Sequence, residues 1–305
     1  MFLRIIFALL SRVDNFFCVR FLSYEKYFNL HRSLGFPLVK LLFYKANGYP
    51  LNLSNPQSFN EKLIYDKLNN RPDLYPIITD KYKARLYVEN KIGAEYLIPL
   101  IGAYDELNMD VLGSITEKCI IKTNHGSHQH FIINDPQSID YKLIISESNK
   151  WLNNKYRFQA LAWFVQKIPR KIVIEKLMVD EEGKVPFDYK FFVFSGKVKF
   201  IQVDADRFSG HHRILYDKNW NKINVDYLVD SGGKNVVSPV NLNLMISLAE
   251  KLGANFNFMR VDLYDNNGKV YFGELTPYPS AGYGPFKPTS YDIDLGDEFK
   301  IKQDI

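Results

Sequence analysis

The stretch FMRVDLYDNNGKVYFGELT, residues 258–276, consists of two β-branched and aromatic runs joined by Asn-Asn-Gly. Runs of this kind favour strands, and Asn-Gly favours a tight two-residue turn, so the stretch predicts an antiparallel hairpin. Side chains two residues apart on a strand point to the same face, which puts Arg260 and Asp262 together. The returning strand is expected to bring Glu274 beside them.

This predicted hairpin has the side chains that a magnesium site needs. Two carboxylates from adjacent strands, with a guanidinium one step away, suit hard cations that bridge phosphate oxygens. A solvated hairpin with a cross-strand salt bridge would contain the same residues. The apolar neighbours of Glu274, in YFGELTP, indicate partial burial instead. Because an unpaired buried carboxylate would be costly, this favours the metal site.

The rest of the chain predicts an α+β fold, since it lacks the strand–helix alternation of a doubly wound sheet. Further strands are expected at 119–123, 130–134, 171–179, 189–196 and 197–205. Ser58 and Glu61 form a capping-box pattern that opens a helix. Further helices are expected at 80–93 and at 239–252, the latter closed by Gly253. We expect a mainly helical region at 1–79, followed by units at 80–178 and 179–305.

Composition limits the class of protein and of partner. The chain has 305 residues, 46% hydrophobic and 24% charged, which is typical of a globular protein. Its net charge of +5 suits a substrate with phosphates or carboxylates but is too small and dispersed to indicate nucleic acid. Cys18 and Cys119 have neither disulfide nor zinc spacing, which fits a reducing compartment and predicts a cytoplasmic protein.

The N-terminal segment leaves two interpretations open. Arg4 interrupts the apolar run at residues 2–10, which is far shorter than the roughly 20 residues of a membrane span. No signal-peptide cleavage site follows it. On a helical wheel, residues 2–17 have one apolar and one polar face. Residues 1–20 therefore form either a helix packed on its own domain or a peripheral helix on the inner face of the membrane.

Two further segments suit a nucleotide. In IIKTNHGSH (120–128), Lys122 leaves a strand and can reach the α- and β-phosphates, while the small-residue loop with Gly126 and Ser127 can donate backbone N–H groups. In KIVIEKLM (171–178), a strand end can hold a purine through its backbone and through Leu177 and Met178. Taken alone, each segment also fits a solvated hairpin or a core strand.

The order of these segments resembles the ATP-grasp superfamily, and more closely its TupA-like branch, named for teichuronopeptide biosynthesis. The resemblance covers about residues 55–290 and is carried by SFNEK (58–62), DKYKAR (80–85), IKTNHG (121–126), DYKFFVFSG (188–196) and GELTP (273–277). It implies an ATP-grasp fold, in which two α+β subdomains grip ATP, here with a mainly helical N-terminal region.

The resemblance also implies roles for individual residues, with ATP and Mg²⁺ as the cofactors. A contact with the α- and β-phosphates is implied for Lys122, followed by its loop with Gly126 and Ser127, and Lys81 lies near the start of the nucleotide-binding part. The segment Glu175, Lys176, Leu177 and Met178 would line adenine, and Asp188 would accept from the ribose hydroxyls. Lys190 would face the phosphates, and Arg260 would steady the charge that develops during catalysis. Asp262 and Glu274 would bind magnesium, with Thr276 where many ATP-grasp enzymes have asparagine.

The implied reaction is the ATP-dependent joining of a carboxylate to an amine through an acyl phosphate. The name of the branch suggests a cell-surface polymer or polysaccharide, with an amino acid joined to a uronic acid. The loop 278–286 forms either a wall of the acceptor pocket or a surface turn. Two other classes stay open. Asp204-Ala-Asp206 matches the metal motif of a glycosyltransferase, and a non-catalytic nucleotide-binding protein could retain the fold.

Overall fold

The computed structural model describes residues 22–154, 160–180, 183–205, 212–229, 231–232 and 235–301. The predicted amphipathic helix at residues 2–17 and Asp206 lie outside the described residues. None of the helices in the described part of the chain combines the length and the apolar character that a bilayer span requires.

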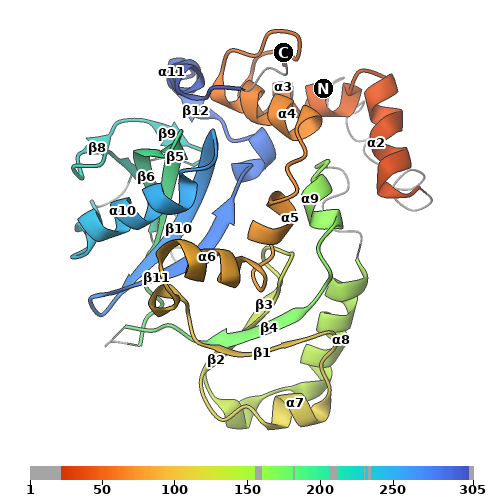
Figure 1. Ribbon diagram of the computed structural model, residues 1–305, viewed down its shortest axis with the longest axis vertical. Helices are drawn as coiled ribbons and strands as arrows, with labels where there is room; N and C mark the ends of the chain where they lie inside the picture. The colour runs from red at the N-terminus through yellow and green to blue at the C-terminus, as the bar shows by residue number, and fades with distance from the viewer. Residues whose placement is uncertain are drawn as a thin grey trace.

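Two antiparallel sheets form the framework (Figure 1). The four-stranded sheet has the order β1-β4-β2-β3, with β1 at Leu100–Tyr104, β2 at Cys119–Thr123, β3 at His130–Ile133 and β4 at Ile172–Lys176. The six-stranded sheet has the order β11-β10-β5-β6-β7-β8. Its strands are β5 Asp188–Phe194, β6 Lys197–Ala205, β7 His212–Tyr216, β8 Lys222–Ile223, β10 Phe258–Asn266 and β11 Lys269–Thr276. A third, two-stranded sheet pairs β9 (Asp226–Tyr227) with β12 (Phe286–Lys287).

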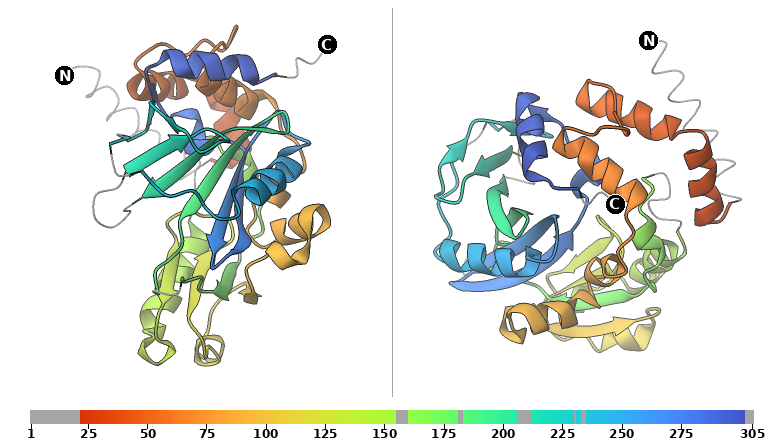
Figure 2. Two further views of the ribbon diagram at one scale, coloured as in Figure 1. Left: turned by 90° about the vertical axis from the view of Figure 1, so that its left-hand side faces the viewer. Right: turned by 45° about the horizontal axis from the view of Figure 1, so that its top comes forward.

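Helices lie at both ends of the molecule and against the larger sheet. At one end are α2 Tyr24–Ser33, α3 Pro37–Asn47, α4 Phe59–Asn69 and α11 Ser290–Glu298, and Figure 2 shows α11 beside α4. The small sheet has α7 Met109–Gly113 and α8 Tyr141–Asn153. Helix α10 (Leu242–Gly253) packs on β10, β5 and β6, and α6 (Ala84–Ile92) packs on α10. The short helices are α5 Tyr75–Ile78 and α9 Trp163–Gln166.

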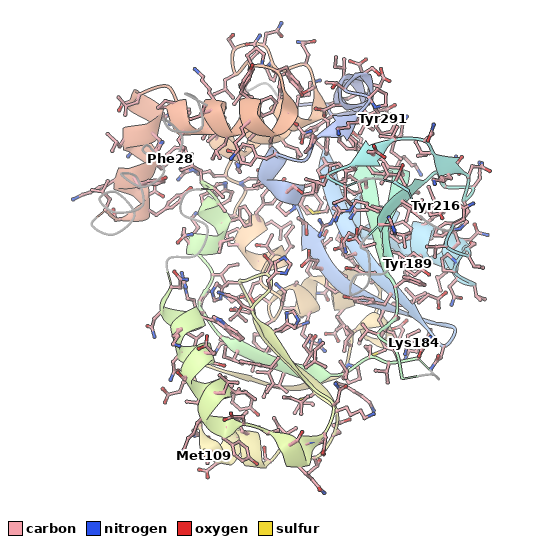
Figure 3. The ribbon with its side chains drawn as sticks, turned by 180° about the vertical axis from the view of Figure 1, so that it is seen from behind. Phe28, Met109, Lys184, Tyr189, Tyr216 and Tyr291 are labelled. Carbon is pink, nitrogen blue, oxygen red and sulfur yellow. The ribbon has the colours of Figure 1, made fainter. Side chains whose placement is uncertain are left out.

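Two hydrophobic cores follow from this arrangement. One joins the N-terminal helices to the six-stranded sheet, and the other lies under the four-stranded sheet around Ile121 and Ile174. Figure 3 shows the side chains, with Met109 at the far end of the smaller unit and Tyr189 and Tyr216 on the larger sheet. The division at residues 80 and 178 stays a prediction, although helices before residue 80 share a core with the larger sheet.

The hairpin predicted at 258–276 is confirmed, and the strands expected at 189–196 and 197–205 also pair as a hairpin. The turns at Ser195-Gly196 and Asn267-Gly268 have positive φ at both residues, as a two-residue turn matching the strand twist requires. Across the second turn, Asp262 pairs with Glu274. Several boundaries differ from expectation, since the strand expected at 171–179 ends at Lys176 and the helix expected at 80–93 begins at Ala84.

Buried polar side chains of helix α4 bind the segment that follows β11, at residues 278–284. Ser58 and Glu61 form the predicted capping box. Further along the helix, Asn60 Nδ2 donates to Gly284 O at 2.7 Å and Lys67 Nζ to Ala281 O at 2.8 Å. Asp66 Oδ2 accepts from Tyr278 Oη at 2.7 Å. The chain that follows β11 is thus tied to α4 by side chains that are themselves buried.

Glycine is required where this segment turns against α4. Gly282 has φ 81°, and a Cβ there would lie 2.9 Å from Ile64 Cγ1. We expect Gly282→Ala to lower the free energy of unfolding by about 2–4 kcal/mol, through left-handed strain and overpacking. Gly268→Ala is the matched control, because Gly268 has φ 74° with nothing within 4 Å, and it should cost only about 1–2 kcal/mol. Denaturant unfolding measures both, and equal losses would contradict the close approach of α4.

Candidate nucleotide and metal site

A row of polar residues crosses one face of the six-stranded sheet. Strand pairing places Glu274 opposite Asp262, Asp262 opposite Lys190, and Lys190 opposite Gln202. Asp262, Lys190 and Gln202 are buried, whereas the side chain of Glu274 is 37% exposed. Buried charges of this kind persist only when they are paired and hydrogen-bonded, so the contacts of the row define the site.

Arg260 lies between the two predicted metal ligands. Its Nε and Nη2 donate to the two oxygens of Asp262 at 2.7 Å each, and Nη2 also donates to Glu274 Oε1 at 2.6 Å. Thr276 Oγ1 donates to the same Glu274 oxygen at 2.8 Å. Burial disfavours the guanidinium charge, but Asp262 and Glu274 outweigh it and raise the pKa of Arg260. The predicted residues of this hairpin therefore do converge.

Lys190 lies among three carboxylates. It is ion-paired with Asp188, and its Nζ lies 3.4 Å from Asp262 and 4.0 Å from Asp204. Burial raises the pKa of Asp262 to about 6 against the influence of Arg260 and Lys190. Burial acts the same way on Glu274, but there Arg260, Lys81 and Lys190 prevail and lower the pKa. Glu274 is thus the more acidic and the more exposed of the two carboxylates.

The donor set fits a hard cation that also binds phosphate. Among the described residues, no group of three or more His, Cys, Asp or Glu side chains is arranged to hold a metal by itself. Asp262 and Glu274 would supply carboxylate oxygens, and the hydroxyl of Thr276 lies beside Glu274. Magnesium usually binds one or two carboxylates and takes its other ligands from phosphates and water.

The loop after β2 is held by Asn124, which is completely buried. Its Nδ2 donates to Asp80 Oδ1 at 2.9 Å and to Pro169 O at 2.8 Å, and its Oδ1 accepts from Lys171 N at 2.9 Å. Asp80 in turn caps the turn that leads into α6 by accepting from backbone amides. The DKYKAR and IKTNHG segments therefore interlock through one amide side chain.

Lys81 connects this loop with the metal ligands. Its backbone N–H donates to Asn124 O at 3.0 Å, and its Nζ donates to Gly126 O at 2.6 Å. Its charge also helps to lower the pKa of Glu274. A Cβ at position 126 would require the side chains of Gln129 and Thr123 to move. Lys81 is therefore bonded to the Gly126 loop and lies close enough to Glu274 for their charges to interact.

Lys122 and Glu175 contact each other across neighbouring strands. Lys122 Nζ lies 2.5 Å from Glu175 Oε2, and Arg85 Nη1 lies 3.4 Å from Glu175 Oε1. The carboxylate of Glu175 is therefore ion-paired with Lys122, and its predicted place beside adenine stays a prediction. Lys176 points outward toward Glu117, at 3.4 Å, and the backbone N–H of Leu177 donates to Lys118 O at 3.0 Å.

The family comparison agrees with this geometry. The family described as TupA-like ATPgrasp matches residues 61–300. The chain belongs to the TupA-like ATP-grasp family. Its fold is the α+β ATP-grasp fold expected from the sequence. No curated protein matches the chain.

Several solved structures are similar to this TupA-like ATP-grasp protein. The ADP complex of purK, N5-carboxyaminoimidazole ribonucleotide synthetase, is 11% identical over 66% of this chain and 45% of its own, with a TM-score of 0.40. D-alanine–D-alanine ligase from Bacillus anthracis complexed with ATP is 15% identical over 66% and 54%, with a TM-score of 0.36. L-amino acid ligase from Bacillus licheniformis is 13% identical over 92% and 63%, with a TM-score of 0.49. The chain spans about half the length of the first two proteins.

Asp204 is the first residue of the alternative metal motif, and both of its carboxylate oxygens accept hydrogen bonds. Arg213 Nε and Nη2 reach its two oxygens at 2.6 and 3.3 Å, and Gln202 Nε2 lies 3.2 Å from both. Arg260 holds Asp262 in the same manner, so this pairing does not separate the two carboxylates, and it is the family membership that disfavours the glycosyltransferase hypothesis. Asp206 lies outside the described residues.

Sequence reasoning missed four residues of this TupA-like ATP-grasp site. Arg85 and Asn124 stand inside the motifs that carry the resemblance, so their position was a usable signal although no role was assigned. Gln202 and Arg213 lie on β6 and β7, and nothing in the local sequence pattern distinguishes them from solvated strand residues. Their significance depends on the pairing of distant strands.

The buried histidine of the loop predicts a pH effect on stability. Burial, together with Arg170 and Lys81, lowers the pKa of His125 to about 4. An unfolded histidine takes up its proton near pH 6.5, so the stability due to neutral His125 is present above that pH and lost as the pH falls toward 4. When the pH is lowered from 7 to 5, we expect the melting temperature of His125→Gln to fall less than that of the unsubstituted protein. Equal slopes in thermal unfolding would contradict the burial of a neutral imidazole.

Proposed function

We propose that the protein is an ATP-dependent carboxylate–amine ligase that forms a C–N bond through an acyl phosphate. The observation that carries the proposal is the convergence of Arg260, Asp262 and Glu274 with Lys81 and the Gly126 loop. This arrangement joins a candidate phosphate loop to a candidate metal site, as phosphoryl transfer requires. The family membership supports the same reaction class.

At the nucleotide end, Lys122 and the loop with Gly126 and Ser127 bind the phosphates. Glu175 and Arg85 pre-orient Lys122, since a lysine held by a carboxylate keeps one position before the phosphates arrive. The backbone amides of Lys176 and Leu177 donate within the small sheet, so Met178 is our candidate donor to the adenine edge. Leu177 and Met178 pack on the base, and Asp188 accepts from the ribose.

At the reacting end, Asp262, Glu274 and the Thr276 hydroxyl would hold magnesium. When bound, the metal neutralises charge on the phosphates and positions them for transfer. Arg260 and Lys190 stabilise the charge that develops as a carboxylate oxygen attacks the γ-phosphorus and ADP leaves. The amine nitrogen then attacks the acyl carbon, phosphate leaves with the C–O electron pair, and the nitrogen gives up a proton to form the amide.

The biological setting is the least constrained part of the proposal. The name of the branch, from teichuronopeptide biosynthesis, suggests cell-surface polymer or polysaccharide synthesis, with a uronic acid as the carboxylate and an amino acid as the amine. A cytoplasmic enzyme acting on such a polymer would work at the inner face of the membrane, where residues 1–20 provide peripheral contact. We propose the loop at 278–286, tied to α4, as a wall of the acceptor pocket.

Replacement of Glu274 tests the metal site. Glu274→Gln keeps the size but removes the charge, and we expect it to lower ATP turnover by at least a hundredfold, about 3 kcal/mol of transition-state stabilisation. The readout is ADP release at saturating magnesium. The control is Glu298→Gln, which removes an exposed carboxylate paired with Lys199 and should leave turnover unchanged. Near-normal turnover in Glu274→Gln would remove the metal site from the proposal.

Replacement of Lys122 tests the phosphate loop. Lys122→Ala should weaken ATP binding and lower kcat, because the ammonium contacts phosphate in both the ground and transition states. We expect at least a tenfold higher Kd for ATP by calorimetry, with little change for adenosine. Lys150→Ala, which removes an exposed lysine paired with Glu147, is the control. An unchanged Kd for ATP would make Lys122 a structural residue that only balances Glu175.

A further inference from the structure

A second polar cluster lies on the same sheet face, beyond the proposed metal ligands. We define the Asp204 cluster as Gln202 and Asp204 on β6 with Arg213 on β7, which pairs directly with Asp204. Arg213 and Gln202 both donate to the two oxygens of Asp204. The Arg213 side chain is 12% exposed and that of Asp204 is 5% exposed. The proposed ligase reaction, as described above, gives this buried cluster no role.

Gln202 presents an acceptor without a partner. The residue is 1% exposed, and its Oε1 has no hydrogen-bond partner among the described residues. The amide cannot simply be reversed, because Nε2 faces the carboxylate of Asp204 and an exchange would turn oxygen toward oxygen. A buried acceptor without a donor is costly, so Oε1 is suited to receive a ligand N–H.

Arg213 presents the complementary group. Its Nε and Nη2 are used by Asp204, whereas Nη1 reaches only Tyr227 O, at 3.5 Å, within the described part of the chain. The guanidinium also lies 5.5 Å from the centre of the Tyr227 ring. With two of its nitrogens locked and its plane packed on an aromatic ring, Arg213 holds Nη1 in place for an acceptor such as a carboxylate.

The cluster stands next to the proposed reaction centre. A single ammonium, that of Lys190, separates Asp204 from Asp262, at 4.0 and 3.4 Å. As defined, the cluster contains one carboxylate and one guanidinium, those of Asp204 and Arg213, which form an ion pair. A simple anion or cation bound here would add an uncompensated charge to a buried site, whereas a zwitterion would not.

We infer that the Asp204 cluster is the binding site of the amine substrate and that this substrate is an amino acid. Arg213 Nη1 binds the carboxylate, and Gln202 Oε1, next to the negative charge of Asp204, accepts from the ammonium. This inference rests on the proposed ligase function and adds the residues that recognise the amino acid. The amino group is then held beside Asp262 and Glu274, where the acyl phosphate is proposed to form.

The first test varies the ligand and leaves the protein intact. Protein saturated with magnesium and a non-hydrolysable ATP analogue is titrated by calorimetry with each of the common L-amino acids. At least one should bind, and its decarboxylated amine and its deaminated acid should each bind at least tenfold more weakly. If the nucleotide binds and no amino acid does, or if either analogue binds as well as the parent, the inference is overturned.

The second test varies the protein with the best amino acid as the probe. Arg213→Lys keeps the charge beside Asp204 but loses the guanidinium fork, and Gln202→Met keeps the length but loses the acceptor. Each should weaken amino acid binding at least tenfold while the Kd for the ATP analogue stays within twofold. Lys222→Gln, on the next strand and bonded to Ser231 O, is the control that should change neither. Unchanged amino acid affinity in both site variants would overturn the inference. Failure of the unsubstituted protein to bind the nucleotide would instead overturn the proposed function.

Discussion

The need to compensate buried carboxylates governs the larger sheet. Asp262 has almost no exposed surface, and a charge in that position is tolerated only because Arg260 binds both of its oxygens and Lys190 lies 3.4 Å away. Arg260 can reach Glu274 as well because the register of β10 and β11 places the two carboxylates opposite each other. A shift by one residue would turn every one of these side chains to the other face.

Two segments of the proposed site lie outside the strands, the loop after β2 and the chain after β11, and side chains from elsewhere hold them in place. The loop after β2 has no strand to support it, and Asn124 fixes it to Asp80 and to the chain before β4. Lys81 adds a further hydrogen bond to this loop, through Gly126 O. Helix α4 holds the segment after Thr276 through Lys67 and Asp66. Side-chain hydrogen bonds therefore restrain both segments that adjoin the proposed site.

The parts of this arrangement that could be predicted are those encoded locally. Alternation along β10 and β11 and the Asn267-Gly268 turn sufficed to place Arg260, Asp262 and Glu274 together, because a two-residue turn fixes the register. The pairing of Lys122 with Glu175 could not be derived in this way, since the order of β4 and β2 in the sheet is set by tertiary packing. For the same reason Arg213 gave no signal, and strand β1 and helix α8 were not expected at all.

The central claim is that Asp262 and Glu274 bind the metal that accompanies ATP. Crystals grown with Mn²⁺ in place of magnesium and a non-hydrolysable ATP analogue test this directly, because manganese is located by its anomalous scattering. The account predicts metal between the triphosphate and these two carboxylates, with Lys122 and the Gly126 loop along the phosphates. Metal bound at Asp204, or a nucleotide bound away from Lys122, would contradict it.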